Sequence, residues 1–339
     1  MDKSSGQPET AVPLVSVVIP THGRPLLVQR ALRTVLDQSF RQLEVIVVVD
    51  GPDEATTDAL SRIVDSRMHV LDTERHVGGS EARNIGVRYA RAKWIAFLDD
   101  DDEWFPAKIQ RQWELGESVL GSCTIIASRF IERTETTDRI LPMRIPLPAE
   151  RMSDYLFVRR GWNSGEGFLQ TSTWFITREL LLRIPFTNGL RKCQDLDWLL
   201  HATSLAQTKL IVSPEVLAVF HHEDHGVRVS REVDWKFLYD WAERNREHFS
   251  PNAFSFLIAT LCVPSASKQR AGIGTFLFLL RKCMPCGKVT AKCFLLFMIC
   301  WWIPESSRRN LRAWIGRVRS VFEPKIALAT SSTVRGKVA

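Results

Sequence analysis

The chain has no long apolar run and no recognisable secretory signal. Its apolar stretch at residues 293–303 is well short of the about 20 residues that a membrane-spanning helix needs. The first ten residues are polar and lack a basic segment followed by an apolar one, so we expect the protein to work in the cytosol. The seven cysteines are an odd number, and without a signal they indicate free thiols instead of a disulfide framework.

Acidic residues are scarce in the C-terminal quarter. Residues 261–339 contain 14 Lys and Arg but only 2 Asp and Glu, whereas the whole chain has 45 and 38. This asymmetry predicts that one end meets an anionic surface, either membrane lipid or nucleic acid. Arginines alternate with large apolar residues at 308–322, which favours a lipid-facing helix over a base-stacking platform. We therefore expect an anionic membrane surface as partner, or a helical cap docked on the domain, and no nucleic acid.

A cysteine pair, Cys283 and Cys286, has the C-x-x-C spacing of zinc and redox sites. No neighbouring histidine or βαβ pattern supports such a site. Cys293 and Cys300 follow seven residues apart in an apolar helical stretch, as core or membrane-facing residues do. We therefore interpret these cysteines as packing residues.

Apolar runs alternate with amphipathic segments in the N-terminal part of the chain. Runs of this kind predict strands, and the segments between them predict helices. The alternation indicates an α/β fold with a parallel sheet covered on both faces, to which residues 124–131 and 173–176 add antiparallel strands. The predicted strands are 14–19, 45–49, 68–71 and 94–98, and the predicted helices are 26–36, 54–64 and 80–92.

Four consecutive aspartates, Asp99 to Asp102, follow the strand at 94–98. Like charges this close raise one another's pKa, whereas a divalent cation would turn their repulsion into binding. Ligation by oxygen atoms alone points to Mg²⁺ or Mn²⁺, which usually also bind a phosphate group of the substrate. A solvated acidic turn is the alternative. The position favours a site, because ligands bind at the carboxyl ends of strands in open α/β sheets.

Four motifs occur in order along the chain: VSVVIPTHGRP, EVIVVVDG, GGSEARNIGVRYARAKWIAFLDDDDEW and CQDLDW. Together they resemble the family 2 glycosyltransferases of the GT-A fold, over roughly residues 13–230. The resemblance implies a Rossmann-like, mostly parallel sheet flanked by helices, here with a C-terminal helical extension. It also implies transfer of a sugar from a nucleotide-diphosphate donor to an acceptor hydroxyl, with inversion at the anomeric carbon. The expected acceptor is a cell-surface glycan or a lipid-linked precursor at the cytosolic face of the inner membrane.

The resemblance and the composition together suggest a division of the chain. The predicted parts are a disordered tail (1–12), a GT-A domain (13–235) with a nucleotide-sugar half (13–118) and an acceptor half (119–235), a helical region of basic and apolar residues (236–329) and a flexible tail (330–339).

The donor-side residues are carried over from the motifs. A register ambiguity remains within the four aspartates, so that Asp102 can replace either member of the DxD pair. The implied roles are the nucleotide pocket for Thr21 and Asp50, the base or diphosphate for Arg83, the ribose for Asp99, and the metal for Asp101 with Asp102.

The acceptor side centres on the motif QDLDW. An inverting displacement needs a base opposite the leaving group, and the resemblance assigns that role to Asp195, with Asp197 as a weaker candidate. The two aspartates could instead cap a helix start and complement its dipole. Gln194 departs from the family pattern, where Glu is common, and so adds no charge to raise the pKa of Asp195.

Three histidines follow a predicted strand at 216–220. Related enzymes often place a histidine near the metal or diphosphate, and among His221, His222 and His225 we choose His222, with a surface histidine cluster as the alternative. A Gly-rich stretch begins at residue 161, and in or just after it Trp162, Gln170 and Thr171 are candidates for the acceptor side.

Two other functions fit parts of the sequence. A sugar nucleotidylyltransferase would share the fold and metal, but it should open with a Gly-rich loop ending in Arg, and this chain has only THGRP at 21–25. A membrane-recruited protein that binds a nucleotide sugar without catalysis is favoured only by Gln194. The complete set of donor motifs makes an active transferase the stronger prediction.

Overall fold

The computed structural model describes residues 12–119, 121, 123–135, 137–162, 165–221, 234–284, 290–304 and 307–308. Within them, one nine-stranded sheet has the order β3-β2-β1-β4-β8-β6-β9-β5, and β7 pairs with β6 outside this path. The strands are β1 (Val15–Thr21), β2 (Leu43–Val49), β3 (Met68–Asp72), β4 (Trp94–Phe97), β5 (Glu103–Trp104), β6 (Thr124–Arg133), β7 (Asp138–Leu141), β8 (Phe175–Thr177) and β9 (Lys209–His221).

The sheet combines a parallel half with antiparallel additions. Strands β3, β2, β1 and β4 pair in parallel, with Val17 opposite Val45 and Val18 opposite Phe97. Strand β8 is antiparallel to both β4 and β6, and β5 is antiparallel to β9, whereas β6 and β9 are parallel. The predicted α/β fold is therefore confirmed, including the antiparallel character of 173–176.

Helices cover both faces of the parallel half. Side chains alternate along each strand: Val18 and Phe97 face one apolar cluster, and Val17 and Ala96 face the other. The first cluster includes residues of α3, and the second includes residues of α1. The two clusters lie on opposite faces of the same strands and have no side chain in common. The helices of this part are α1 (Pro25–Leu36), α2 (Glu54–Ser61), α3 (Gly79–Tyr89) and α4 (Lys108–Glu117).

Helix α3 lies directly against β1 because Gly86 has no side chain. A Cβ atom at Gly86 would overlap the Val18 side chain. The helix starts after Gly78, whose φ of 85° lies in the left-handed region that glycine adopts without strain. This close seating fixes where Arg83, in the middle of α3, meets the end of β4.

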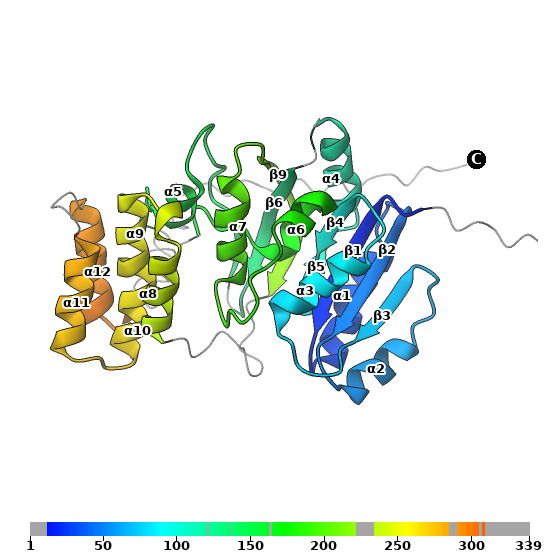
Figure 1. The fold of residues 1–339 in the computed structure, drawn as a ribbon, viewed down its shortest axis with the longest axis horizontal. Coiled ribbons are helices and arrows are strands. Elements are labelled where there is room, and N and C mark those ends of the chain that lie inside the picture. Colours follow the sequence, from blue (N-terminus) through cyan, green and yellow to red (C-terminus); the bar gives the residue numbers. More distant parts are fainter. Residues whose placement is uncertain are drawn as a thin grey trace, which may run out of the picture.

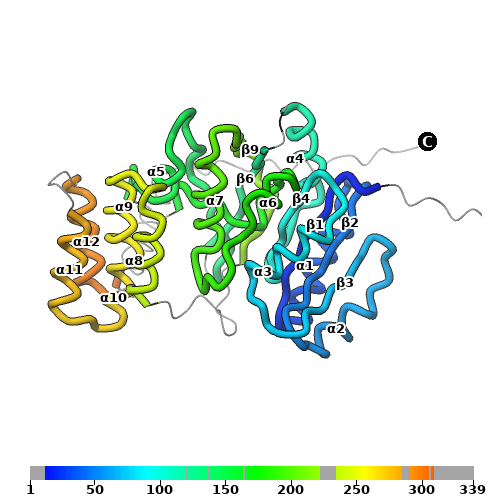
Figure 2. The backbone as a smooth tube through the Cα atoms, viewed as in Figure 1, coloured from blue at the N-terminus to red at the C-terminus, as the bar shows by residue number. Residues whose placement is uncertain are grey.

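A group of helices occupies the end of the molecule opposite β2 and β3 (Figure 1). In Figure 2 the colours run from blue at the sheet end to orange at this helical end, where α11 and α12 lie. These helices share one continuous apolar cluster with α3 and the sheet. The remaining helices are α5 (Met152–Phe157), α6 (Arg178–Arg183), α7 (Gln194–Ser204), α8 (Trp235–Arg244), α9 (Pro251–Leu257), α10 (Val263–Lys268), α11 (Ile273–Cys283) and α12 (Ala291–Trp302).

Several sequence predictions differ from the structure in detail. The strand predicted at 216–220 is the end of a longer one, β9, which pairs with β6 through register shifts near Ser128. The helix predicted at 54–64 ends at Ser61. The apolar stretch at 254–263 contains a π-helical turn, Ile258–Cys262. Among the described residues no helix combines the length and apolarity of a membrane span.

The cysteines in the described part are free thiols, as predicted. Cys283 lies in α11 with its sulfur 4.0 Å from the sulfur of Cys293 in α12, and both are buried. Cys286 lies outside the described residues, as do His222, His225 and the basic segment after Arg308.

Candidate active site

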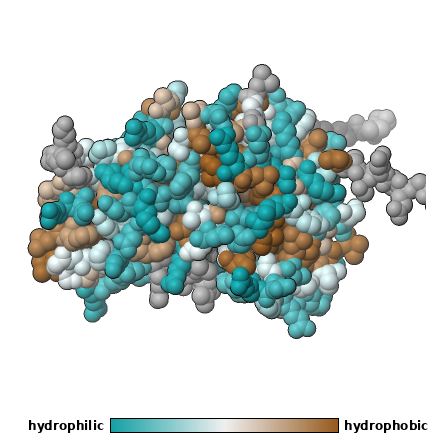
Figure 3. Space-filling view, in the orientation of Figure 1, coloured by the Kyte–Doolittle hydropathy of each residue, from teal (hydrophilic) through white to brown (hydrophobic). Residues whose placement is uncertain are grey.

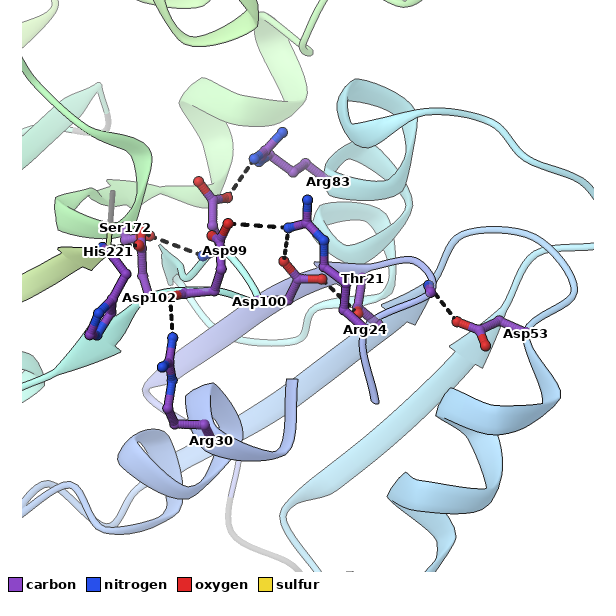
Figure 4. Close-up of polar contacts among 12 residues, drawn as sticks. Thr21, Arg24, Arg30, Asp53, Arg83, Asp99, Asp100, Asp102, Ser172 and His221 are labelled. Carbon is purple, nitrogen blue, oxygen red and sulfur yellow. Dashed lines mark hydrogen bonds and ion pairs between the residues drawn. The ribbon is translucent and has the colours of Figure 1, made fainter. Parts of the chain in front are cut away.

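Polar side chains gather where β1, β2 and β4 reach their carboxyl ends. Thr21 ends β1, Asp50 follows β2, and the four aspartates follow β4. Figure 4 shows Thr21 beside Asp99, Asp100 and Asp102. Because these strands are parallel neighbours, their ends meet at one edge of the sheet, where ligands bind in open α/β folds. Among the sequence-predicted donor residues, the structure brings Thr21 and Arg83 into contact with the aspartates.

Asp99 is linked through Arg83 to the acceptor side. The Arg83 guanidinium donates from Nη2 to Asp99 Oδ1 at 2.5 Å and from Nη1 to Gln194 Oε1 at 3.0 Å. Gln194 in turn donates from Nε2 to the Leu190 carbonyl at 2.7 Å. A single arginine therefore connects the end of β4 with the first residue of α7, next to Asp195.

Asp100 is buried under β1. It accepts hydrogen bonds from Thr21 Oγ1 at 2.8 Å and from Arg24 Nη1 at 2.9 Å. Burial raises the pKa of Asp100 to about 6, although the positive charge of Arg24 acts in the opposite direction. Thr21, predicted in the nucleotide pocket, thus holds the buried carboxyl group of Asp100.

Asp101 is partly exposed beside two arginines from the start of α1. Its carboxylate accepts from Arg24 Nη1 at 3.2 Å, and its backbone carbonyl accepts from Arg30 Nη2 at 2.6 Å. The side chains of Asp99 and Asp101 are 25% and 28% exposed, respectively. These two carboxylates, separated by the buried Asp100, are therefore the ones open to a ligand.

Asp102 points the other way, into the protein. It is 0% exposed, and its Oδ2 accepts from Ser172 Oγ at 2.6 Å and from Gln170 Nε2 at 2.7 Å. The backbone N–H of His221 donates to its other oxygen at 3.2 Å. Burial, followed by the charges of Asp101 and Asp99, raises the pKa of Asp102 well above its usual value. These contacts tie the aspartate run to β9.

Asp50 holds the loop that leads into α3. Its carboxylate accepts from the backbone N–H groups of Val77 at 2.6 Å and Gly78 at 2.9 Å, and His76 Nδ1 lies 3.0 Å away. Asp50, which the sequence predicts in the nucleotide pocket, therefore holds the loop at Val77 and Gly78. This loop leads into α3, the helix that carries Arg83.

Asp195 and Asp197 occupy the first turn of α7 but have different surroundings. Burial raises the pKa of Asp195, while nearby backbone donors and Arg83 lower it. The carboxylate of Asp197 is buried and accepts from Thr187 Oγ1, Trp241 Nε1 and Asn245 Nδ2 at 2.7, 2.8 and 3.2 Å. Asp197 thus joins α7 to α8, whereas in the described part of the chain no side chain donates a hydrogen bond to the Asp195 carboxylate.

The remaining predicted residues lie in several places. His221 is buried and contacts Glu103 Oε1 at 2.7 Å through Nε2. Gln170 and Thr171 are buried beneath the aspartates, whereas Trp162 is exposed and has Lys292 Nζ 5.2 Å from its ring centre. In the described part of the chain, no three His, Cys, Asp or Glu side chains converge on one metal position.

Sequence reasoning missed the basic and polar partners of the aspartates. Arg24 and Arg30 stand about 70 residues before the aspartates, and Ser172 follows them by a similar distance. These residues alternate with apolar ones, as other polar residues of the chain do, so no sequence pattern marked them as partners of the aspartates. The parallel pairing of β1 with β4 places the start of α1 beside the end of β4, and this strand order was not predicted from the sequence.

Comparison with known proteins agrees with the fold. The model of glycosyl transferase family 2 matches residues 16–184. The amylovoran biosynthesis glycosyltransferase AmsB of Erwinia amylovora is 27% identical over 69% of this chain and 78% of its own length. The UDP-Glc:alpha-D-GlcNAc-diphosphoundecaprenol beta-1,3-glucosyltransferase WfaP of Escherichia coli is 31% identical over 29% of this chain and 39% of its own. Among solved structures, residues 1–349 of S. aureus TarS with UDP-GlcNAc superpose with a TM-score of 0.55 at 15% identity, covering 84% of this chain and 79% of that one.

The fold and the relatives define an α/β enzyme that transfers sugars. The chain belongs to glycosyl transferase family 2 and is a glycosyltransferase. The predicted GT-A fold with a C-terminal helical extension is confirmed, whereas the likeness to TarS concerns the fold alone.

Proposed function

We propose that the protein is an inverting glycosyltransferase that moves a sugar from a nucleotide-diphosphate donor to a hydroxyl group of a lipid-linked glycan precursor. One observation carries the proposal: Arg83 joins Asp99, at the donor edge of the sheet, to Gln194, the neighbour of Asp195. Such a link holds a carboxylate of the proposed donor site and the proposed proton acceptor on two elements at a fixed separation. Displacement at an anomeric carbon requires both groups at once.

The donor site is proposed at Asp99 and Asp101. Their partly exposed, all-oxygen carboxylates fit Mg²⁺ or Mn²⁺, because such an ion needs only one or two protein carboxylates when it is shared with a diphosphate. When bound, the ion would neutralise charge on the departing nucleoside diphosphate. The metal role predicted for Asp102 is less favoured, since three donors occupy its oxygens. His222 remains a candidate from the sequence.

Asp195 is proposed as the general base. A carboxylate with a raised pKa accepts a proton more readily from the attacking hydroxyl, provided that it is ionised at the working pH. Its place at the start of α7 supplies nearby backbone N–H groups that favour the ionised form. Asp197 serves α7 as an anchor in this proposal.

The acceptor class follows from the relatives and the charge of the chain. By its name, WfaP acts on a sugar linked to diphosphoundecaprenol, and AmsB takes part in amylovoran biosynthesis. A lipid-linked acceptor would bring the enzyme to the cytosolic membrane face, for which the basic C-terminal quarter is suited. TarS, which shares the fold, was solved with UDP-GlcNAc, so uridine nucleotides are the first donors to test.

The transfer can be tested with bacterial membranes as the source of lipid acceptors. Purified protein is incubated with membranes, Mn²⁺ and radiolabelled UDP-, GDP- or dTDP-sugars, and label in the organic extract is counted. We expect Asp195→Asn to retain nucleotide binding while transfer falls by about 10²-fold or more. Asp240→Asn, an exposed aspartate on α8, is the matched control. Transfer by Asp195→Asn at the wild-type rate would refute Asp195 as the base.

A further inference from the structure

The helical end of the molecule has an apolar surface made by α11 and α12. Along α12, Leu295, Met298 and Trp302 follow the spacing of one helix face, and Trp302 is 64% exposed. On α11, Ile273 and Leu277 stand one turn apart and are both more than half exposed. Figure 3 shows hydrophobic residues gathered at this end. We call the exposed side chains of Ile273, Leu277, Phe278, Leu295 and Trp302, together with the half-buried Met298, the apolar end face.

The opposite faces of the two helices are well packed. The Phe276 ring of α11 lies 5.5 Å from Phe297 and 5.1 Å from Trp301, both on α12. Cys283 and Cys293 are buried between the same helices. The apolar end face is therefore held in place by its own core and is not a frayed segment. A helix that faces water usually presents polar residues, but α12 carries a single charged residue, Lys292.

The chain segment that forms the apolar end face carries charge of one sign. No Asp or Glu stands between Glu247 and Glu305 in the sequence. The same interval contributes the exposed Lys268 and Arg270 before α11 and the exposed Arg281 near its end, whereas Lys282 interacts with Glu243 of α8 and Lys292 donates to the Arg160 carbonyl. Basic side chains around an apolar stripe match an anionic lipid surface, where each Lys or Arg near the headgroups adds to binding.

We propose that the apolar end face docks on an anionic lipid bilayer, with α11 and α12 lying along its surface and Trp302 at headgroup depth. Helix α12 has 12 residues and so a length of about 18 Å, which suits an interfacial helix and not a membrane span. A second copy of the chain fits less well, because a two-fold dimer would bring these basic residues opposite one another. The inference rests on the proposed function only in explaining why a bilayer is the relevant surface.

Vesicle sedimentation with the full chain tests the docking face. The probes are vesicles of phosphatidylcholine alone and vesicles mixed with phosphatidylglycerol. The test variant is Leu277→Gln/Leu295→Gln/Trp302→Gln. The control, Val64→Gln/Ile140→Gln/Leu147→Gln, changes equally apolar exposed residues elsewhere. We expect wild type and control to bind the anionic vesicles, with an affinity that falls as the salt concentration rises. The test variant should bind these vesicles at least about tenfold more weakly.

Three results would overturn the proposal. If the wild-type protein does not bind anionic vesicles, it has no such docking face. Undiminished binding by the test variant would assign lipid affinity to residues after Arg308. Concentration-dependent dimerisation of the wild type, lost in the test variant, would assign the face to a second copy. Nucleotide binding is measured on the same samples: a wild type that binds vesicles but no nucleotide contradicts the proposed transferase and leaves the docking face standing.

Discussion

Asp197 is expected to stabilise the protein by anchoring the helix that carries the proposed base. Its buried carboxylate accepts from Trp241 Nε1 at 2.8 Å and Asn245 Nδ2 at 3.2 Å, and both donors are buried. A buried donor left without an acceptor costs about 1–3 kcal/mol, and a cavity adds to this cost. Asp197→Ala should therefore lower the free energy of unfolding by about 3–5 kcal/mol. Asp197→Asn keeps one oxygen for Trp241 and should lose about half as much.

Urea unfolding followed by tryptophan fluorescence measures these losses. Asp240→Ala is the matched control, because Asp240 is an exposed aspartate of α8 whose loss should change stability by no more than about 0.5 kcal/mol. The anchoring role also predicts that Asp197→Asn, assayed where it is fully folded, lowers kcat by displacing Asp195. If Asp197→Ala unfolds at the same urea concentration as Asp240→Ala, the argument for a buried anchor is wrong.

Two further substitutions test buried polar groups near the site. Lys108 is fully buried over the Trp104 ring without a hydrogen-bond partner in the described structure, and burial lowers the pKa of its amine well below 10.5. Lys108→Met should raise the unfolding free energy by about 1–3 kcal/mol at about pH 7. Because the folded pKa is lowered, wild-type stability rises with pH toward the unfolded pKa, so this gain should shrink by about pH 9; a gain independent of pH would contradict the reasoning. Gln194→Glu adds a charge beside Asp195 and Arg83, so the acidic limb of the kcat–pH profile should move to higher pH, and an unmoved profile would show that position 194 does not act on the base.

The parallel half of the fold was predictable because its signals are local. Apolar runs at 45–49 and 94–98 are buried on both faces, and the glycines before Ser80 mark the start of α3. These signals locate the ends of the strands, and therefore the edge at which the aspartates lie. The boundaries of the later elements were less predictable, since β9 depends on register shifts against β6 instead of on a pattern of its own.

The contacts within the candidate site were less predictable than its location. The sequence could not separate four identical aspartates, because their roles follow from which way each side chain points. Asp100 and Asp102 turn inward to Thr21 and Ser172, whereas Asp99 and Asp101 stay partly exposed. The hydrogen bonds between Asp197 and α8 join residues more than 40 positions apart, and no local sequence pattern predicts such a contact.

The central claim is that Asp99 and Asp101 form a metal-assisted site for a nucleoside diphosphate. Calorimetric titration of UDP, GDP, dTDP and CDP into the protein, with and without Mn²⁺, tests it most directly when repeated on Asp101→Asn. The control is Asp58→Asn, which alters only an exposed pair with Arg62. The account predicts that one nucleotide binds with Mn²⁺ to wild type and control, and at least about tenfold more weakly to Asp101→Asn. A folded wild type that binds none of the four, or an Asp101→Asn variant that binds as well as wild type, would contradict it.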